Sequence, residues 1–557
     1  MAVVTAMTAQ AVYMEVHRVS DREDLADIHE RYWFVVTADV DMGGRTVEIP
    51  EGSVLEFCGG SLRGGRLRLD NVEVRAAAYP VFAGCQVEGT IANHDIDAAW
   101  FGEVYGDDCS EAVNRALAFA GARNRVVLGA GNVNVRKPLE LSKDGQKLHC
   151  AGTLRVHGDI AAVRLTAANP DVDIHCIEGA VADTRRVRDF NGTGILFAGN
   201  VRGGNVRVGH INCVETSIDL APMQAVKGKA GVEGNSVYFQ YIRSVNGIRF
   251  DVTPGNVANQ RTTTWINNNY FNGGRLQCRK GIVVVPPKGN DTKRHKRLDG
   301  NFFDCIGFEG YYTADGIFSL ANDTEADCAD TRLLDLRYMS NTTMRDMRMS
   351  ENLPGLNPGN QKGYPWMQFA DCRDVTIDTK SGIYRAHVDV AHSTHCHNVR
   401  IGHCFTDKQG YLFNDMEWMT VFTPDNQASG RCQAVVTQAD AAVDSVNIID
   451  ASALPDSVGW TEIFSDVPGA DDVKVPVRKC VVSVPPGRKL LVDFGRQYQS
   501  VNTPVQLTVN LGAGAVLSVK SAKTTAPWQI KTSGCYLITW DIDCNLKLLN
   551  LTKSTHP

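Results

Sequence analysis

The stretches NSVYF at 235–239 and GIRF at 247–250 decide the fold, because the same pattern occurs four times along the chain. Each copy has an asparagine, an apolar strand, a second strand, and a small residue before Ile that opens a third. The copies read Asn205-Val-Arg-Val with Ser217-Ile-Asp-Leu220, Asn235-Ser-Val-Tyr-Phe with Gly247-Ile-Arg-Phe250, Asn268-Asn-Tyr-Phe with Gly281-Ile-Val-Val284, and Asn301-Phe-Phe-Asp with Gly316-Ile-Phe-Ser319. The asparagines stand at positions 205, 235, 268 and 301, and a nearly constant spacing of this size is typical of stacked repeats.

Stacking such units places equivalent residues above one another. Asn at a bend can then hydrogen-bond the Asn of the next unit and tolerates left-handed backbone. Shorter copies follow, CRDVTI at 372–377 and CHNVRI at 396–401. We therefore predict an all-β chain whose residues 97–415 form a right-handed parallel β-helix, with loops on one side where ligands bind.

Composition excludes several classes of protein. The formal charge is −6 over 557 residues, too small to call for nucleic acid or a membrane surface. The first ten residues lack the pattern of a secretory signal, so we expect synthesis in a reducing cytoplasm and no membrane insertion. The 16 cysteines include no CxxC pair. We predict that Cys58, Cys213, Cys278, Cys305 and Cys372 fill the core as free thiols.

The two ends of the chain differ from its middle in their sequence pattern. A capping box at Ser20 and Glu23 predicts a short helix near 20–31, within an adaptor at 1–33. Short strands separated by Gly-Gly turns fill 34–96, in a pattern that fits a sandwich or a coiled solenoid. After about 415, strands alternate with Pro-Pro-Gly and Gly-Ala-Gly turns, which predicts a β-sandwich-like domain over 416–557.

Residues 97–156 resemble the opening module of pectate-lyase-superfamily β-helices, which include phage tail spikes. Asp97-Ala-Ala-Trp-Phe-Gly102, the acidic pair at 107–108, a helical stretch at 110–122 and Arg125-Val-Val-Leu follow that module's order. The chain departs from it at Glu103-Val-Tyr and at Gly129-Ala130. The resemblance implies a helix that covers the open end of the first coil.

Residues 39–65 resemble the opening of β-helical tail proteins from phages and prophages of Bacteroides-like gut bacteria. The resemblance rests on Asp39-Val-Asp-Met-Gly-Gly-Arg-Thr-Val-Glu-Ile-Pro and on Phe57-Cys-Gly-Gly-Ser-Leu-Arg-Gly-Gly. It implies a homotrimeric, virion-borne receptor-binding protein that joins other tail proteins through its N-terminus and leaves the cell by lysis. It implies little about catalysis.

Candidate catalytic groups lie near the fourth repeat and in a histidine-rich segment. Asp304, Glu309 and Asp315 could supply the two carboxyl groups that glycoside hydrolysis needs. His387 and Asp389 share a strand face and could form an acid–base pair or bind a metal, or they could be polar residues of successive coils. No standard ligand spacing occurs, so we predict neither metal nor cofactor. Polygalacturonase and pectate-lyase calcium motifs are absent.

Two further groups are candidates for binding sugar. Lys293, Arg294 and Arg297 belong to a basic loop that could hold an anionic polysaccharide or simply be solvated. Tyr312 and Trp366 could stack on sugar rings or pack between coils. Two hypotheses follow: a receptor-binding protein that recognises bacterial surface polysaccharide, and a depolymerase, either glycoside hydrolase or polysaccharide lyase, that cleaves it.

Overall fold

The computed structural model is an all-β chain that divides into two compact units, residues 1–176 and 177–557. The structure describes residues 14–184, 189–222, 229–252, 263–285, 298–309, 332–349, 367–381, 391–394, 397–402, 411–413, 418–421, 434–436, 446–450, 461–463, 479–484, 486–487, 489–493, 505–520, 526, 528–540 and 546–551. No helix in these ranges is long and apolar enough to cross a membrane.

The first unit consists mainly of short parallel strands. Its elements are β1 Val16–Val19, η1 Glu23–Leu25, β2 Trp33–Val36, β3 Asp39–Asp41, β4 Thr46–Ile49, β5 Val54–Phe57, β6 Ser61–Arg63, β7 Gly65–Arg75, β8 Cys85–Ile91, β9 Asp95–Asp97, η2 Ala98–Phe101, α1 Ser110–Phe119, β10 Arg125–Leu128, β11 Asn132–Val135, β12 Leu139–Leu141, β13 Lys147–Val156 and β14 Ala161–Leu165. The boundary between the units falls inside β15, Asp171–Gly179.

Parallel pairing begins earlier in the first unit than the sequence resemblance implies. Strands β1, β2, β5 and β7 pair in order and in parallel, as do β4, β7 and β8. Thr46 of β4, for example, pairs with Arg66 of β7. The described pairs within residues 34–96 are therefore parallel, whereas the sandwich that the sequence also left open would use antiparallel pairs. Because this pairing precedes α1 in the chain, α1 does not stand before the first parallel strands.

The two predicted helices have different outcomes. Helix α1 is present at Ser110–Phe119, and its Arg115 donates hydrogen bonds to the carbonyls of Phe82, Cys85 and Phe101. The helix predicted near 20–31 is wrong beyond the three residues of η1. Asp21 and Asp24 there accept backbone N–H groups, which favours a local turn over a continued helix.

The second unit contains the longest strands of the chain, β18, β20 and β22. Its elements are β16 Thr193–Phe197, β17 Val201–Arg202, β18 Asn205–Leu220, β19 Lys229–Glu233, β20 Ser236–Asp251, β21 Thr263–Asn267, β22 Tyr270–Val285, β23 Leu298–Asp299, β24 Phe302–Asp304, β25 Gly307–Glu309, β26 Arg332–Arg337, β27 Met339–Met349, β28 Met367–Ala370, β29 Arg373–Ser381, β30 Ala391–Thr394, β31 His397–Gly402, β32 Tyr411–Phe413, β33 Trp418–Val421, β34 Ala434–Val436, β35 Val446–Asp450, β36 Thr461–Ile463, β37 Lys479–Val484, β38 Lys489–Asp493, β39 Val505–Leu511, β40 Val516–Lys520, β41 Trp528–Ile530, β42 Gly534–Trp540 and β43 Leu546–Asn550.

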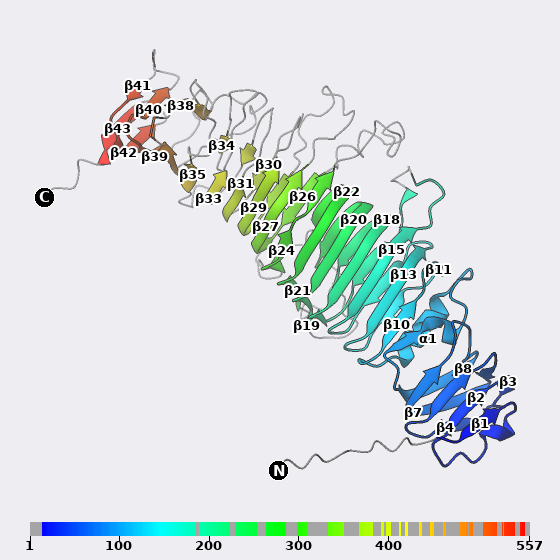
Figure 1. The fold of residues 1–557 in the computed structure, drawn as a ribbon. Helices are drawn as coiled ribbons and strands as arrows, with labels where there is room; N and C mark the ends of the chain where they lie inside the picture. Colours follow the sequence, from blue (N-terminus) through cyan, green and yellow to red (C-terminus); the bar gives the residue numbers. More distant parts are fainter. Residues whose placement is uncertain are drawn as a thin grey trace, which may run out of the picture. The chain divides into compact units, whose positions relative to one another are not determined.

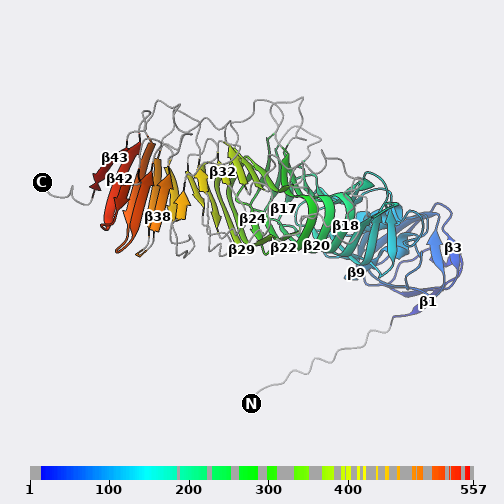
Figure 2. The same ribbon diagram turned by 90° about the horizontal axis from the view of Figure 1, so that it is seen from above.

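These long strands lie side by side (Figures 1 and 2) and pair in parallel, with a register shift between β18 and β20 at Asn212–Val214. Strand β22 then pairs with the shorter β24, β25 and β26, and β27 pairs with β24 and β29. Alternate side chains point inward and make a column of buried apolar groups. Its members are Val206, Val237, Phe271, Phe303 and Met344.

A buried ladder of asparagines stands at one bend of the stack. Nδ2 of Asn235 donates to Oδ1 of Asn269 at 2.9 Å, and Nδ2 of Asn269 donates to Oδ1 of Asn301 at 3.1 Å. The same amides donate to the carbonyls of Val201 and Val232. The Oδ1 atoms of the ladder also accept the backbone N–H groups of the bend residues Gly204, Asn235 and Asn269, so these buried donors have partners.

Two of the four asparagines that were predicted to stack at the bend, Asn205 and Asn268, lie one residue after or before the observed bend position. The bend position lies directly before each strand, so Asn269 takes the place of Asn268, and Gly204 takes that of Asn205. Asn205 itself starts β18 and pairs with Ser236. The predicted fourth small-residue pair, Gly316-Ile317, lies outside the described residues, and Leu334 of β26 is the partner of Ile282.

Pairing also differs from the prediction near the C-terminus. Strands β33, β35, β37 and β39 still pair in parallel, so no change of pairing marks residue 416. Within the described residues, antiparallel pairing joins β39 to β42, β42 to β43 and β40 to β41. The antiparallel pairs that a sandwich would use are thus confined to 505–550.

The cysteine prediction is right for three thiols and wrong for two. Cys213, Cys278 and Cys372 are buried, whereas Cys58 and Cys305 are exposed. Burial raises the pKa of Cys278 to about 12, so this thiol stays protonated as a small apolar group.

Phe239 points inward on β20 and is fully buried, and Gly273 on β22 leaves room for its ring. Gly273 pairs with Phe239, and a Cβ atom on Gly273 would lie 2.2 Å from Cζ of that ring. We predict that Gly273→Ala lowers the free energy of unfolding by about 1–3 kcal/mol, since a fully buried ring cannot move aside. Chemical denaturation measures this. Gly307→Ala is the control, because its Cβ would meet no atom closer than 3.5 Å; equal losses would contradict the packing described.

Candidate functional site

The outward side chains of the paired strands form two polar and aromatic columns. Because inward and outward positions alternate along a strand, the residues beside the buried column face solvent. The first column runs Arg207, Tyr238, Asn272, Asp304 and Arg345, and the second runs Asn205, Ser236, Tyr270, Phe302 and Thr343. Register alone thus brings together residues that are far apart in the sequence.

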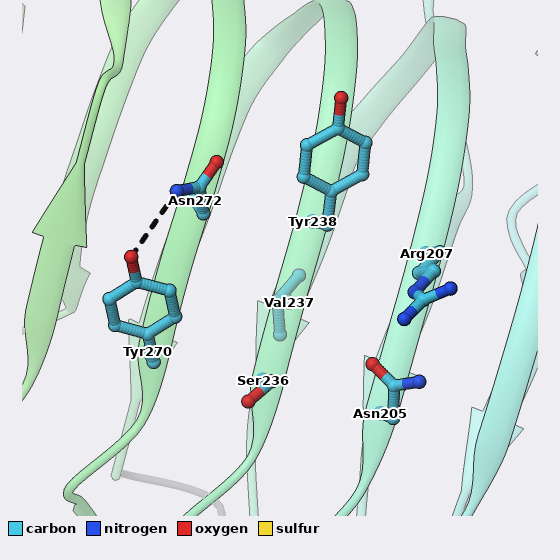
Figure 3. Close-up of a pocket in the computed structure, with 7 residues that line it drawn as sticks. All are labelled: Asn205, Arg207, Ser236, Val237, Tyr238, Tyr270 and Asn272. Carbon is cyan, nitrogen blue, oxygen red and sulfur yellow. Dashed lines mark hydrogen bonds between the residues drawn. The ribbon is translucent and has the colours of Figure 1, made fainter.

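Part of these columns encloses a shallow groove of about 530 Å³. Figure 3 shows the residues that line it, on three neighbouring strands, β18, β20 and β22. They are Asn205, Arg207, Ser236, Val237, Tyr238, Tyr270 and Asn272. The volume is within the range of small-ligand sites.

Three aromatic side chains are unusually exposed on this face. Tyr238 is 42% exposed, Tyr270 36% and Phe302 42%. Tyr270 and Phe302 are direct partners on β22 and β24. Exposed aromatic rings gathered on one face are a common feature of ligand-binding and partner-binding surfaces.

Hydrogen bonds hold Tyr270 in place. Its hydroxyl donates to Oδ2 of Asp304 at 3.0 Å and accepts from Nδ2 of Asn272 at 3.2 Å (Figure 3 shows the second bond). The ring therefore has little freedom to rotate away from the groove. Such an ordered platform loses less side-chain entropy when a ligand binds.

Asp304 is ionised and paired. Arg345 donates to Oδ2 of Asp304 at 3.0 Å, and the Asp304 side chain is only 14% exposed. Burial acts to raise the pKa of Asp304, but the hydrogen bonds from Tyr270 and Arg345 outweigh it and hold the pKa below its ordinary value. A carboxylate in this state can act as a nucleophile, a base or an acceptor, whereas a general acid must carry a proton.

Because its pKa is lowered in the folded protein, the contribution of Asp304 to the free energy of unfolding depends on pH. A group whose pKa is depressed by folding stabilises the protein above its unfolded pKa, about 4, and loses that effect as the pH falls through the folded value. We expect Asp304→Asn to cost about 1–2 kcal/mol at pH 7 and progressively less below about pH 4. Unfolding curves of both proteins between pH 7 and pH 3 test this, and a constant difference would contradict the assignment.

Arg207 and Tyr238 contrast with this paired group. Within the described residues, neither the Arg207 guanidinium nor the Tyr238 hydroxyl has a hydrogen-bond or ion-pair partner in the protein. The two residues are direct partners on β18 and β20. Both are therefore available to a ligand in the groove.

One sequence-predicted catalytic residue borders the groove. Asp304 contacts Tyr270, which lines it; Glu309 ends β25 as the partner of Gln277. The other predicted residues lie outside the described ranges: Asp315, His387 and Asp389 as catalytic groups, and Tyr312, Trp366, Lys293, Arg294 and Arg297 as binding groups. Asp304, Cys305 and Asp346 offer ligand atoms within 4.8 Å of one another, but Arg345 already neutralises Asp304 and we assign no ion to them.

The sequence analysis missed the residues that line the groove. Its repeats already contained the signal, because Val237 and Phe239 are apolar at alternate positions and so leave Tyr238 facing outward. The same alternation around Phe271 turns Tyr270 and Asn272 outward. The sequence-based candidates were chosen as acidic, histidine-rich and basic groups and as aromatic residues near loops, and none of them lies on β18, β20 or β22.

The comparisons with known proteins give a sparse result. Neither a protein-family model nor a curated protein sequence matches the chain. Among solved structures, the chain is similar to a tailspike of an Acinetobacter phage, at 10% identity and a TM-score of 0.30, over 80% of this chain and 65% of the tailspike chain. It is also similar to a surface adhesin of Streptococcus pneumoniae, at 11% identity and a TM-score of 0.30, over 82% of this chain and 98% of the adhesin chain. The match thus spans less than two thirds of the tailspike chain.

Proposed function

We propose that the chain is a tailspike-like receptor-binding protein and that the groove on β18, β20 and β22 binds a bacterial surface polysaccharide. The observation that carries the proposal is the cluster of exposed aromatic rings of Tyr238, Tyr270 and Phe302, which lie in two adjacent outward columns beside polar side chains. A pyranose ring presents an apolar C–H face to an aromatic ring and hydroxyl groups at its edge. Asn272, Ser236 and Arg207 stand where they can bond those hydroxyls.

We further propose that the stacked strands form a right-handed parallel β-helix. Parallel in-register partners, such as Ile218, Ile248 and Ile282 on three successive long strands, support this architecture, as does the asparagine ladder. The remaining features belong to the same proposal: a homotrimer on a phage or prophage virion of a Bacteroides-like host, an N-terminus joined to other tail proteins, and release by lysis. They rest on the sequence resemblance at 39–65.

A depolymerase is the second candidate, and one contact favours it. Asp304 is an ionised carboxylate bonded to Tyr270 at the edge of the groove, as a retaining glycosidase nucleophile would be. A partner acid would have to come from elsewhere, such as Glu309. The polysaccharide-lyase form of this hypothesis would require a base, a role open to the same carboxylate.

One experiment separates binding from cleavage. The chain is incubated with purified capsule from candidate host bacteria, and both the bound fraction and the glycan size are followed with time. Binding with unchanged size supports the receptor-binding proposal. Shorter products that disappear in Asp304→Asn support the depolymerase, and ultraviolet-absorbing unsaturated ends among them indicate a lyase. Absence of binding to every capsule would overturn the proposed function.

A further inference from the structure

The groove carries a positive charge that has no ion-pair partner among the described residues. Among its seven lining residues, Arg207 is the one charged group, and it has no hydrogen-bond or ion-pair partner in the described part of the chain. Arg345, in the same column, differs because Asp304 pairs with it. Of these two arginines, only Arg345 has an acidic partner within the described ranges.

We propose that the groove selects an acidic sugar, with a ring carboxylate bound by Arg207 while the sugar ring stacks on Tyr238. This inference rests on the proposed function and names its ligand class. A guanidinium matches a carboxylate with two parallel N–H donors. Arg207 is exposed in the free protein. A carboxylate can therefore reach its guanidinium directly from solvent.

The strand register sets the two contacts at a suitable separation. Arg207 and Tyr238 are direct partners on adjacent strands, whose backbones are about 4.8 Å apart. A ring carboxylate projects from the edge of the sugar, so a sugar centred on Tyr238 directs it toward a neighbouring strand. On the opposite side of Tyr238 the partner is Asn272, an uncharged amide suited to hydroxyls. This asymmetry favours one orientation of the sugar.

The test compares acidic polysaccharides with their neutral counterparts. Uronic-acid-containing bacterial polysaccharides are immobilised beside their carboxyl-reduced forms, in which each acid has become a neutral sugar on an unchanged backbone. We expect wild-type protein to prefer an acidic form by about tenfold to hundredfold, the size of a charge-assisted contact. Arg207→Gln should abolish this preference, and added salt should weaken it.

A matched variant keeps the test specific. Arg348→Gln removes an exposed arginine of β27 outside the groove and should leave the preference unchanged. Arg207→Lys should retain part of it, because lysine keeps the charge but loses the two-donor geometry.

The outcomes separate the two proposals. Equal binding of acidic and reduced forms, unaffected by Arg207→Gln, overturns the acidic-sugar inference and leaves glycan binding standing. Preference for a phosphate-bearing polymer over every carboxylate also overturns it. If no glycan binds and Tyr238→Ala instead disrupts association between copies of the chain, the groove is a subunit interface and both proposals fail.

Discussion

Replacing Asn269 with alanine is expected to lower the free energy of unfolding by about 3–4 kcal/mol, because each buried polar group left without a partner costs about 1–3 kcal/mol. The substitution removes the acceptor of the Asn235 backbone N–H and side-chain amide, and the donor to Val232 and Asn301. Equilibrium denaturation in urea measures the loss.

Two controls make this prediction specific to the ladder. Asn200→Ala removes an exposed asparagine of the same unit and should change stability by less than about 0.5 kcal/mol. Asn269→Asp keeps the acceptor but loses both donors, so it should also be strongly destabilising. If Asn269→Ala were as mild as Asn200→Ala, the ladder would not hold the bend.

Truncation of the groove tyrosines should have the largest effect on ligand binding. Tyr238→Ala and Tyr270→Ala are each expected to weaken glycan binding by about tenfold to hundredfold, since buried aromatic anchors carry most of the energy of an interface. Calorimetric titration with a bound polysaccharide provides the measurement. Both side chains face solvent in the free protein, so folding should be preserved.

Further variants separate stacking from hydrogen bonding. Tyr270→Phe keeps the ring but loses the bonds to Asp304 and Asn272, and should reduce affinity less than alanine does. Trp528→Ala removes another exposed aromatic ring, 41% exposed on β41 and outside the groove, and should leave affinity unchanged. Equal losses from Trp528→Ala and Tyr238→Ala would indicate a nonspecific effect.

The sequence predicted the stacked parallel strands because their signal is periodic and local. Asn235 and Asn301 were identified correctly, since each directly precedes a strand that begins within one residue of an apolar side chain. Asn268 was wrong because three consecutive asparagines, at 267–269, give no local reason to choose among them. Only the start of β22 at Tyr270 makes Asn269 the bend residue.

Other features depend on partners that periodicity does not reveal. Cys58 and Cys305 were predicted to be buried because they stand in strand-like contexts, yet each directly follows the last residue of a strand, β5 and β24, and is exposed. The groove combines three strands that are distant in the sequence, so its composition emerges only when the register is known. Asp304 was found because it directly follows an aromatic strand, but its partner Arg345 lies on β27, well beyond the repeat that contains Asp304.

A crystal structure of the chain with an acidic oligosaccharide tests the central claim most directly. We predict electron density for a sugar ring against Tyr238 and Tyr270, with its carboxylate on Arg207 and its hydroxyls near Asn272. A sugar bound elsewhere on the chain, with this groove empty or covered by a second copy, would contradict the account.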